Sequence, residues 1–164
     1  MNGFTTSNQV GFALMKAGLS PFALDADMLQ IVWQGENYTV FTDCLPELYI
    51  EKKVPLYCFE YKNEISIINY AMDRVNIRRS PVVVYRGGSE DMICFRICIL
   101  TDYAEDFLDH LDSYYIKIEN AVDAFGQACE VAVRYFEEEM MSDCVEELTN
   151  PDPDSPWIKN KRNS

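Results

Sequence analysis

The sequence has little of the material from which most active sites are built. It contains a single histidine, His110, so any catalytic pair with a histidine base depends on that one residue. It contains no Cys-x-x-Cys pair, no phosphate-binding P-loop, no dinucleotide-binding glycine fingerprint, no nucleophile elbow and no His-Glu zinc motif. These absences exclude the common enzyme signatures, and we expect a protein without catalytic residues, bound metal or cofactor.

Positive charge is also scarce. The chain has 14 Lys and Arg against 27 Asp and Glu, which gives a formal net charge of -13. Such a charge repels the phosphate groups of nucleic acids and anionic lipids, and the basic clusters at 78–79 and 159–162 are small. No stretch approaches the roughly 20 apolar residues of a membrane span. We therefore expect neither nucleic acid nor membrane as a partner.

The cysteines lack the dense, regular spacing of a secreted disulfide scaffold. The six are Cys44, Cys58, Cys94, Cys98, Cys129 and Cys144. We expect them to be mostly buried free thiols, as in a reducing compartment. The first fifteen residues have neither a basic residue nor an unbroken apolar run, so no secretory signal is expected there. Both observations predict a cytoplasmic protein.

The first third of the chain predicts one helix followed by three strands. The helix begins at an N-cap among residues 5–7 and ends at Gly18. Alternating apolar and polar residues predict strands over 28–33, 38–42 and 48–54, the first two joined by a turn at 34–37. In the third strand, lysines are expected at exposed positions of the sheet.

The middle of the chain predicts a helix and a hairpin. Apolar residues recur at helical spacing from Ile65 to Val75. Two apolar, β-branched runs, 82–85 and 92–100, then flank Gly87 and Gly88. No helix follows these glycines, so they predict a hairpin turn and not a phosphate-binding loop.

The last third predicts a long amphipathic helix and an acidic tail. Apolar residues recur at spacings of three and four from Leu108 to Phe136, with a possible break near 113–115. Residues 137–154 carry eight acidic side chains and no basic one, and prolines follow Asn150. We predict a single domain over 1–144 and an acidic, flexible tail over 145–164.

The predicted strand 92–100 is apolar on both faces, interrupted by Arg96. An antiparallel sheet that helices cover on one side usually has polar residues on the other side. The second face of this sheet therefore needs cover, either from the long helix of the same chain or from another chain. The sequence is compatible with both alternatives.

The order of these elements resembles a known family. The features that carry the resemblance are the helix Val10–Gly18, the strands within 28–54, Ile68-Asn69 and Asn76 in the second helix, and the hairpin after it. They resemble the bacterial sensory-transduction-regulator (YbjN-like) domain, which is related in fold to type III secretion chaperones. The resemblance implies an α+β fold with a five-stranded antiparallel sheet in the order α-βββ-α-ββ-α, often dimeric, and a regulatory, chaperone-like role without catalytic residues.

Our favoured hypothesis is a non-catalytic protein-binding or chaperone-like module that holds a partner polypeptide on an apolar sheet or groove surface. Aromatic residues and arginine are enriched in interface cores. The candidate partner-binding residues are therefore Trp33, Tyr38, Tyr85, Arg96 and Cys98.

Two alternatives belong to other classes. The chain could be a homo-oligomeric structural protein, a homodimer whose extra apolar face is covered by its own copy. It could also be a metal-dependent hydrolase that uses the acidic cluster around Asp106 and His110. Helical spacing spreads that cluster over more than one face, and carboxylates near a helix N-terminus are expected from the helix dipole alone.

Overall fold

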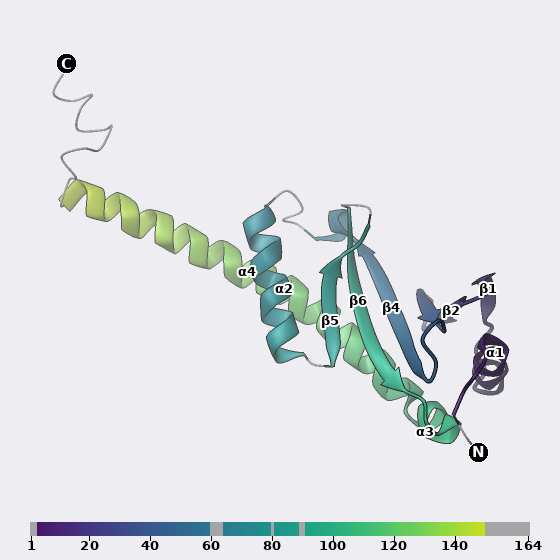
Figure 1. Ribbon diagram of the computed structural model, residues 1–164. Coiled ribbons are helices and arrows are strands. Elements are labelled where there is room, and N and C mark those ends of the chain that lie inside the picture. The colour runs from purple at the N-terminus through teal and green to yellow at the C-terminus, as the bar shows by residue number, and fades with distance from the viewer. Residues whose placement is uncertain (1–2, 60–63, 80, 89–90, 150–164) are drawn as a thin grey trace.

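The computed structural model describes residues 3–59, 64–79, 81–88 and 91–149, with side chains as far as Glu139. It is an α+β protein in which four α-helices accompany one antiparallel sheet (Figure 1). The elements in chain order are α1 (Ser7–Lys16), β1 (Phe22–Asp25), β2 (Met28–Trp33), β3 (Glu36–Phe41), β4 (Glu47–Pro55), η1 (Leu56–Cys58), α2 (Ile65–Arg78), β5 (Val82–Arg86), β6 (Met92–Leu100), α3 (Ala104–Asp109) and α4 (Leu111–Thr149).

The sheet has six strands, in the order β1-β2-β3-β4-β6-β5, so the prediction of five strands was wrong. The missing strand is β1, which pairs antiparallel with β2 through Phe22↔Gln30 and Ala23↔Leu29. All four of its residues are exposed, so it has no alternation of apolar and polar positions for a pattern to detect. Pairing with β2, and not burial of its own side chains, holds this strand in the sheet.

The predicted hairpin of β2 and β3 is confirmed, with a tighter turn than expected. The two strands pair from Met28↔Phe41 to Trp33↔Glu36, which leaves Gln34 and Gly35 as the only turn residues. Both have positive φ angles, 51° and 81°. A two-residue turn of this hand matches the right-handed twist of the strands, and glycine adopts it without steric cost.

β4 lies in the middle of the sheet, between β3 and β6, and not at an exposed position. It pairs with β6 over nine residues, from Glu47↔Leu100 to Pro55↔Met92. Lys53 is exposed as expected, but Lys52 is buried beneath the helices, where the sequence pattern predicted an exposed lysine. Two glutamates compensate its charge, as described below.

The core lies between one face of the sheet and the helices α2 and α4. α4 passes behind the strands in Figure 1, and Phe125 of this helix packs against Phe95 of β6 with ring centroids 5.8 Å apart. α2 packs against α4 and against β5 at the edge of the sheet. The buried helix residues recur at spacings of three and four, such as Ile118, Ala121 and Phe125 in α4, which confirms the amphipathic pattern.

The ends of the helices differ from expectation in two places. α1 has the predicted N-cap: the Thr6 hydroxyl oxygen accepts a hydrogen bond from the Gln9 N–H, 3.2 Å. The break in the long helical segment lies at His110, between α3 and α4, and not near 113–115. α4 then continues to Thr149, four residues past the predicted start of the tail, and residues 150–164 lie outside the described residues.

The cysteines are less buried than predicted. Cys94 and Cys129 are buried, whereas Cys44, Cys58 and Cys98 are exposed, and all five are free thiols. Cys144 lies beyond the described side chains, and residues 89 and 90 of the predicted Gly-Gly turn lie outside the described residues. Among the helices of the described segments, none combines the length and the apolar character that a membrane crossing requires.

Candidate functional site

The two faces of the sheet have different surroundings. One face packs against helices, and its side chains in β2, β4 and β6, such as Ile31, Ile50 and Ile97, are fully buried. The opposite face looks toward the viewer in Figure 1, and no helix of the described residues lies over it. We call this second surface the open face.

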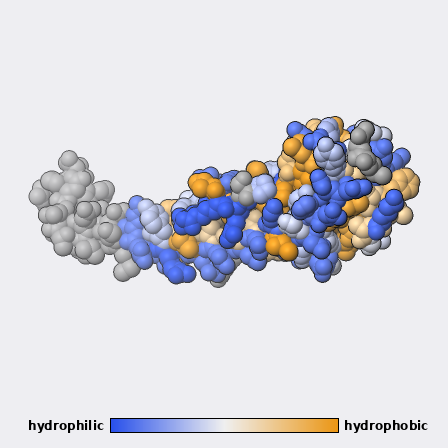
Figure 2. Space-filling view, turned by 90° about the horizontal axis from the view of Figure 1, so that it is seen from below, coloured by the Kyte–Doolittle hydropathy of each residue, from blue (hydrophilic) through white to orange (hydrophobic). Residues whose placement is uncertain are grey.

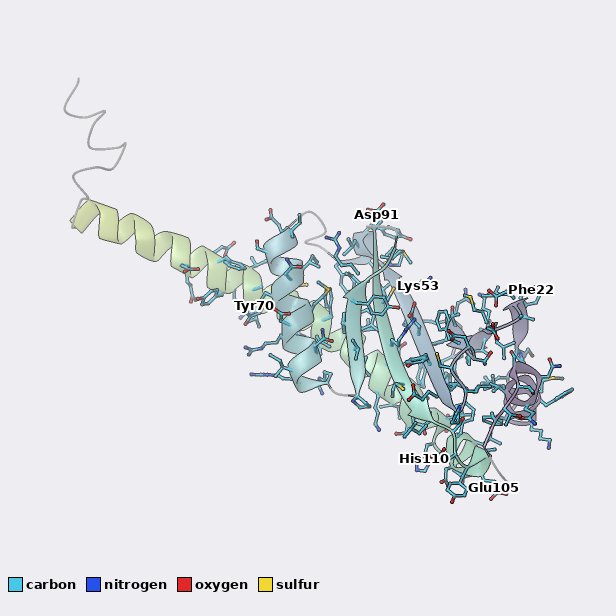
Figure 3. The ribbon with its side chains drawn as sticks, in the orientation of Figure 1. Phe22, Lys53, Tyr70, Asp91, Glu105 and His110 are labelled. Carbon is cyan, nitrogen blue, oxygen red and sulfur yellow. The ribbon has the colours of Figure 1, made fainter. Side chains whose placement is uncertain are left out.

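Large apolar side chains lie exposed on the open face. Phe22, Val32, Val83 and Leu100 are each 54% to 66% exposed there. They come from β1, β2, β5 and β6, so apolar side chains occur across the whole width of the sheet. Figure 3 labels Phe22 on β1 and Lys53 on β4, which both belong to this face. Apolar side chains spread over one uncovered surface are typical of an interaction site.

Arg96 forms the centre of the open face. Its guanidinium lies 4.9 Å from the ring centroid of Phe41, 5.0 Å from that of Tyr49 and 5.4 Å from that of Tyr85. Its Nε donates a hydrogen bond to the Glu51 carboxylate, 2.9 Å. We call these five residues, which come from β3, β4, β5 and β6, the Arg96 cluster.

The sheet register explains why the cluster forms. Glu51 and Arg96 are directly opposite each other in the β4–β6 pair. Tyr49 lies opposite Phe41 in the β3–β4 pair, two residues before Glu51 and on the same face. A one-residue slip in either pair would move these side chains to the helix side.

The Glu51 carboxylate is buried although no helix covers the open face. Its residue is 2% exposed, because Arg96 and Tyr85 lie over it and the Tyr85 hydroxyl also donates a hydrogen bond to it. Burial, followed by the hydrogen bond to Glu51 and the charge of that carboxylate, raises the pKa of the Tyr85 hydroxyl above its ordinary range. The cluster is therefore a fixed, charge-paired arrangement of rings around one arginine.

Cys94 lies beside this cluster and is not an activated nucleophile. Burial and then the nearby Glu51 charge raise the pKa of its thiol to about 11. At neutral pH the thiol is protonated, and the thiolate is the reactive form of cysteine.

The structure separates the five candidate partner-binding residues into two groups. Tyr85, Arg96 and Cys98 lie on the open face, where Cys98 pairs with Tyr49 in the β4–β6 register. Trp33 and Tyr38 instead point toward the helices and are 5% and 1% exposed, so they offer no accessible surface. Strand alternation places Trp33 on the same face as Ile31, which the sequence could have shown.

Trp33 and Tyr38 belong to a polar and aromatic contact that holds α4 on the sheet. The Trp33 ring lies 5.7 Å from that of Tyr38 and 5.3 Å from that of Tyr115 on α4. The Lys52 Nζ contacts the Glu119 carboxylate of α4 at 2.6 Å and also pairs with Glu36. The Tyr38 hydroxyl donates to Glu119 as well, and burial together with that carboxylate raises the pKa of Tyr38 above its ordinary range.

Sequence reasoning missed three members of the Arg96 cluster: Phe41, Tyr49 and Glu51. Their residue types did not indicate a place in this cluster, since glutamate in a predicted strand usually faces solvent. A hairpin register would have placed Phe41 opposite Tyr49, but the β4–β6 pairing joins Glu51 to Arg96 across 45 positions of sequence. That pairing is visible only in the folded chain.

One edge of the sheet is closed by a side chain. β5 is an edge strand, and the Asn76 amide of α2 bonds both backbone groups of Val84. The Val84 N–H donates to Asn76 Oδ1 at 2.7 Å, and Asn76 Nδ2 donates to the Val84 carbonyl at 3.0 Å. Asn76 thus occupies the positions that an added strand would use, so strand addition is blocked at this point of the edge.

A pocket opens at the β1–β3 end of the open face. Its volume is about 420 Å³, and it is lined by Met28 and Phe41 together with three aspartates, Asp25, Asp27 and Asp43. Phe41 also belongs to the Arg96 cluster, so the pocket adjoins it. Three carboxylates beside apolar side chains are suited to a basic side chain of a partner.

Comparison with known proteins supports the fold. No family model matches the chain, and no curated protein matches it at a significant level. Among solved structures, YbjN from E. coli, a proposed transcription regulator, matches with a TM-score of 0.53 at 8% identity, over 82% of this chain and 96% of its own. The chain shares the fold of YbjN. An uncharacterized protein from Methanothermobacter thermautotrophicus matches with a TM-score of 0.55 at 11% identity, over 78% of this chain and 99% of its own.

Both neighbours are matched over nearly their whole length, so this chain contains their complete fold. About a fifth of this chain lies outside each match. The resemblance inferred from the order of elements is thus supported at the level of the fold. At these identities the likeness shows the fold alone.

His110 and Asp106, the basis of the hydrolase alternative, lie at the α3 end of the molecule, where Figure 3 labels His110 and Glu105. The His110 ring Nδ1 lies 2.7 Å from the backbone oxygen of Asp106. The contact of the ring is therefore with the backbone and not with the Asp106 carboxylate. Within the described residues, no group of three His, Cys, Asp or Glu side chains is placed to hold a metal ion. No observation at this end favours the hydrolase.

Proposed function

We propose that this chain is a non-catalytic, cytoplasmic protein-binding module of chaperone-like or regulatory type, which holds a partner polypeptide on the open face. The observation that carries the proposal is the Arg96 cluster together with the exposed apolar side chains around it. Arginine held between aromatic rings, with apolar residues at the margin, is the composition of an interface core. The fold shared with YbjN, itself a proposed regulator, is consistent with this role.

The surface favours one kind of partner. The aspartate-lined pocket adjoins the Arg96 cluster through Phe41, so a bound segment meets apolar contacts and carboxylates side by side. The matching segment carries apolar side chains with at least one lysine or arginine next to them. The net charge of -13 strengthens the attraction to basic segments and limits contact with acidic proteins.

A matched pair of variants tests the proposal. The open-face variant combines Val83→Glu with Leu100→Glu, and the control combines Phe12→Glu with Met15→Glu on α1, where both side chains are similarly exposed. Partners captured from the native host by the wild-type chain are identified, and the affinity of each purified partner is then measured. We expect the open-face variant to weaken binding by about 30-fold or more, because charge enters an apolar contact.

The control variant is expected to bind as the wild type does. Equal affinity of the wild type and the open-face variant for every purified partner would refute the use of this face. Circular dichroism of both variants shows whether the fold is retained, since all four positions are exposed.

A further inference from the structure

A groove between α2 and α4 gathers positive charge on an otherwise acidic protein. It has a volume of about 150 Å³ and is lined by Arg74, Arg78 and Arg79 over an apolar floor that includes Val75, Ala128 and Val131. Arg74 lies over the ring of Tyr70, which Figure 3 labels, at 5.8 Å. We call this feature the arginine groove.

Arg74, Arg78 and Arg79 form no ion pair with a carboxylate in the described part of the chain. Like charges placed this close repel one another, and arginine forms its strongest contacts with carboxylates and phosphates. The groove is therefore suited to an anionic segment whose apolar side chains can also contact its floor.

An acidic segment with that character lies in α4 itself. Residues 137–149 contain six acidic residues and no basic one, and α4 remains helical through Thr149. Six like charges within this short stretch of sequence repel one another. Acidic residues near the C-terminus of a helix also oppose the helix dipole, and the last turn has no basic residue. This end of α4 projects beyond the sheet and has a mainly hydrophilic surface (Figures 1 and 2).

The acidic end of α4 extends away from the groove of its own chain. From Ala128 to Thr149, α4 extends about 32 Å away from the groove at 1.5 Å per residue. Asp152 and Asp154 follow Thr149 by three and five residues, which reach back at most about 18 Å. The acidic segment that fits the groove therefore comes from a second molecule.

We propose that the arginine groove binds the acidic end of α4 from a second copy of this chain, in a symmetric dimer. In an antiparallel α4 pair that places Ala128 opposite position 142 of the partner, the two-fold axis passes near Tyr135. Val131 and Tyr135 are 43% and 53% exposed in the single chain, and the pairing covers both. The helices overlap from about residue 121 to Thr149, a contact about 42 Å long. Each groove receives one acidic helix end, so the interface closes on itself.

Solution mass measured by light scattering across protein concentration tests the dimer directly. We expect a mass near twice 18.9 kDa at about 0.05 M salt, falling toward the monomer at about 0.5 M salt, because salt screens the ionic contacts. A monomer at every concentration in low salt would overturn the proposal.

Charge reversal on each side gives a sharper test. The groove variant carries Arg74→Glu, Arg78→Glu and Arg79→Glu, and the helix variant carries Glu138→Arg, Glu139→Arg and Glu146→Arg. Each variant alone is expected to be monomeric, with a dimerisation constant weakened by about 100-fold or more. Mixed in equal amounts, the two variants are expected to form a heterodimer. In one contact the acidic groove of the first variant meets the basic helix of the second, and the other contact keeps the native basic groove and acidic helix.

Two controls distinguish a dimer formed through the groove from a dimer formed through another surface. Lys16→Glu, Lys53→Glu and Lys117→Glu together change the net charge by the same amount as the groove variant at other exposed positions, and this triple variant is expected to remain a dimer. The open-face variant, Val83→Glu with Leu100→Glu, is also expected to remain a dimer. Dissociation of the open-face variant, or failure of the two charge-reversed chains to pair, would refute the groove as the contact.

Discussion

The bonds between Asn76 and Val84 allow a quantitative prediction about stability. Replacing Asn76 with Ala removes both hydrogen bonds, of 2.7 Å and 3.0 Å, and leaves the N–H and C=O of Val84 without these partners. Each net hydrogen bond contributes roughly 0.5–1.5 kcal/mol, and water can reach part of this site because Asn76 itself is exposed. We expect a loss of about 1–2 kcal/mol in the free energy of unfolding.

A second asparagine on the same helix provides the control. Alanine has a higher helix propensity than asparagine by roughly 0.5 kcal/mol, so Asn76→Ala also gains stability from the helix itself. Asn69 lies exposed on α2 and makes no hydrogen bond of the kind that Asn76 makes within the described residues. The difference between Asn69→Ala and Asn76→Ala therefore isolates the contribution of the two bonds.

Thermal and urea unfolding measure the effect. For a chain of this size, about 1–2 kcal/mol corresponds to a fall in Tm of roughly 2–8 °C. Asn76→Ala also frees the edge of β5, whose apolar, β-branched residues can pair with another strand, so we expect faster aggregation than in Asn69→Ala. Equal melting temperatures and aggregation rates of the two variants would refute this account of Asn76.

Four further predictions concern the buried charges and the thiols. Glu51→Ala is expected to lower the free energy of unfolding by about 2 kcal/mol in urea titrations, because Arg96 then lies among the rings without its carboxylate; unchanged stability would contradict the pairing. Lys52→Met is expected to lower the free energy of unfolding by a similar amount and to weaken the packing of α4 on the sheet. Amide hydrogen exchange in α4 should then be faster than in the wild type. In the native chain a maleimide is expected to label exposed Cys98 but not buried Cys94, and mass spectrometry locates the label. The thiol pKa of Cys94 is raised from its ordinary 9.0 to about 11, so its contribution to stability is complete below pH 9.0 and is lost as the pH rises through about 11; Cys94→Ala should reduce that loss.

The proposed open-face and arginine-groove contacts use different elements. The open face is formed by strands, whereas the groove lies between α2 and α4. A dimer formed through α4 therefore leaves the Arg96 cluster of each copy accessible to a partner. Two copies in one assembly would present two binding faces, which raises the apparent affinity for a partner with repeated segments.

The sequence by itself determined most of the local structure. Period-two alternation predicted β2, β3 and β4, the two apolar runs predicted β5 and β6, and helical spacing predicted α1, α2 and α4. Each of these signals depends only on neighbouring residues, because a buried face repeats with the period of its own element. β1 was missed for the same reason, since an exposed strand has no buried face to repeat.

The tertiary structure alone decided which side chains meet. Glu51 reaches Arg96 through the β4–β6 register, across 45 positions of sequence, and no local pattern contains that pairing. Local patterns likewise do not contain the burial of Lys52, which depends on Glu119 of α4. They also do not contain the burial of Trp33 and Tyr38, which α4 covers. Sequence patterns specify the elements, but the long-range packing determines whether an aromatic residue or an arginine lies in the core or on an open surface.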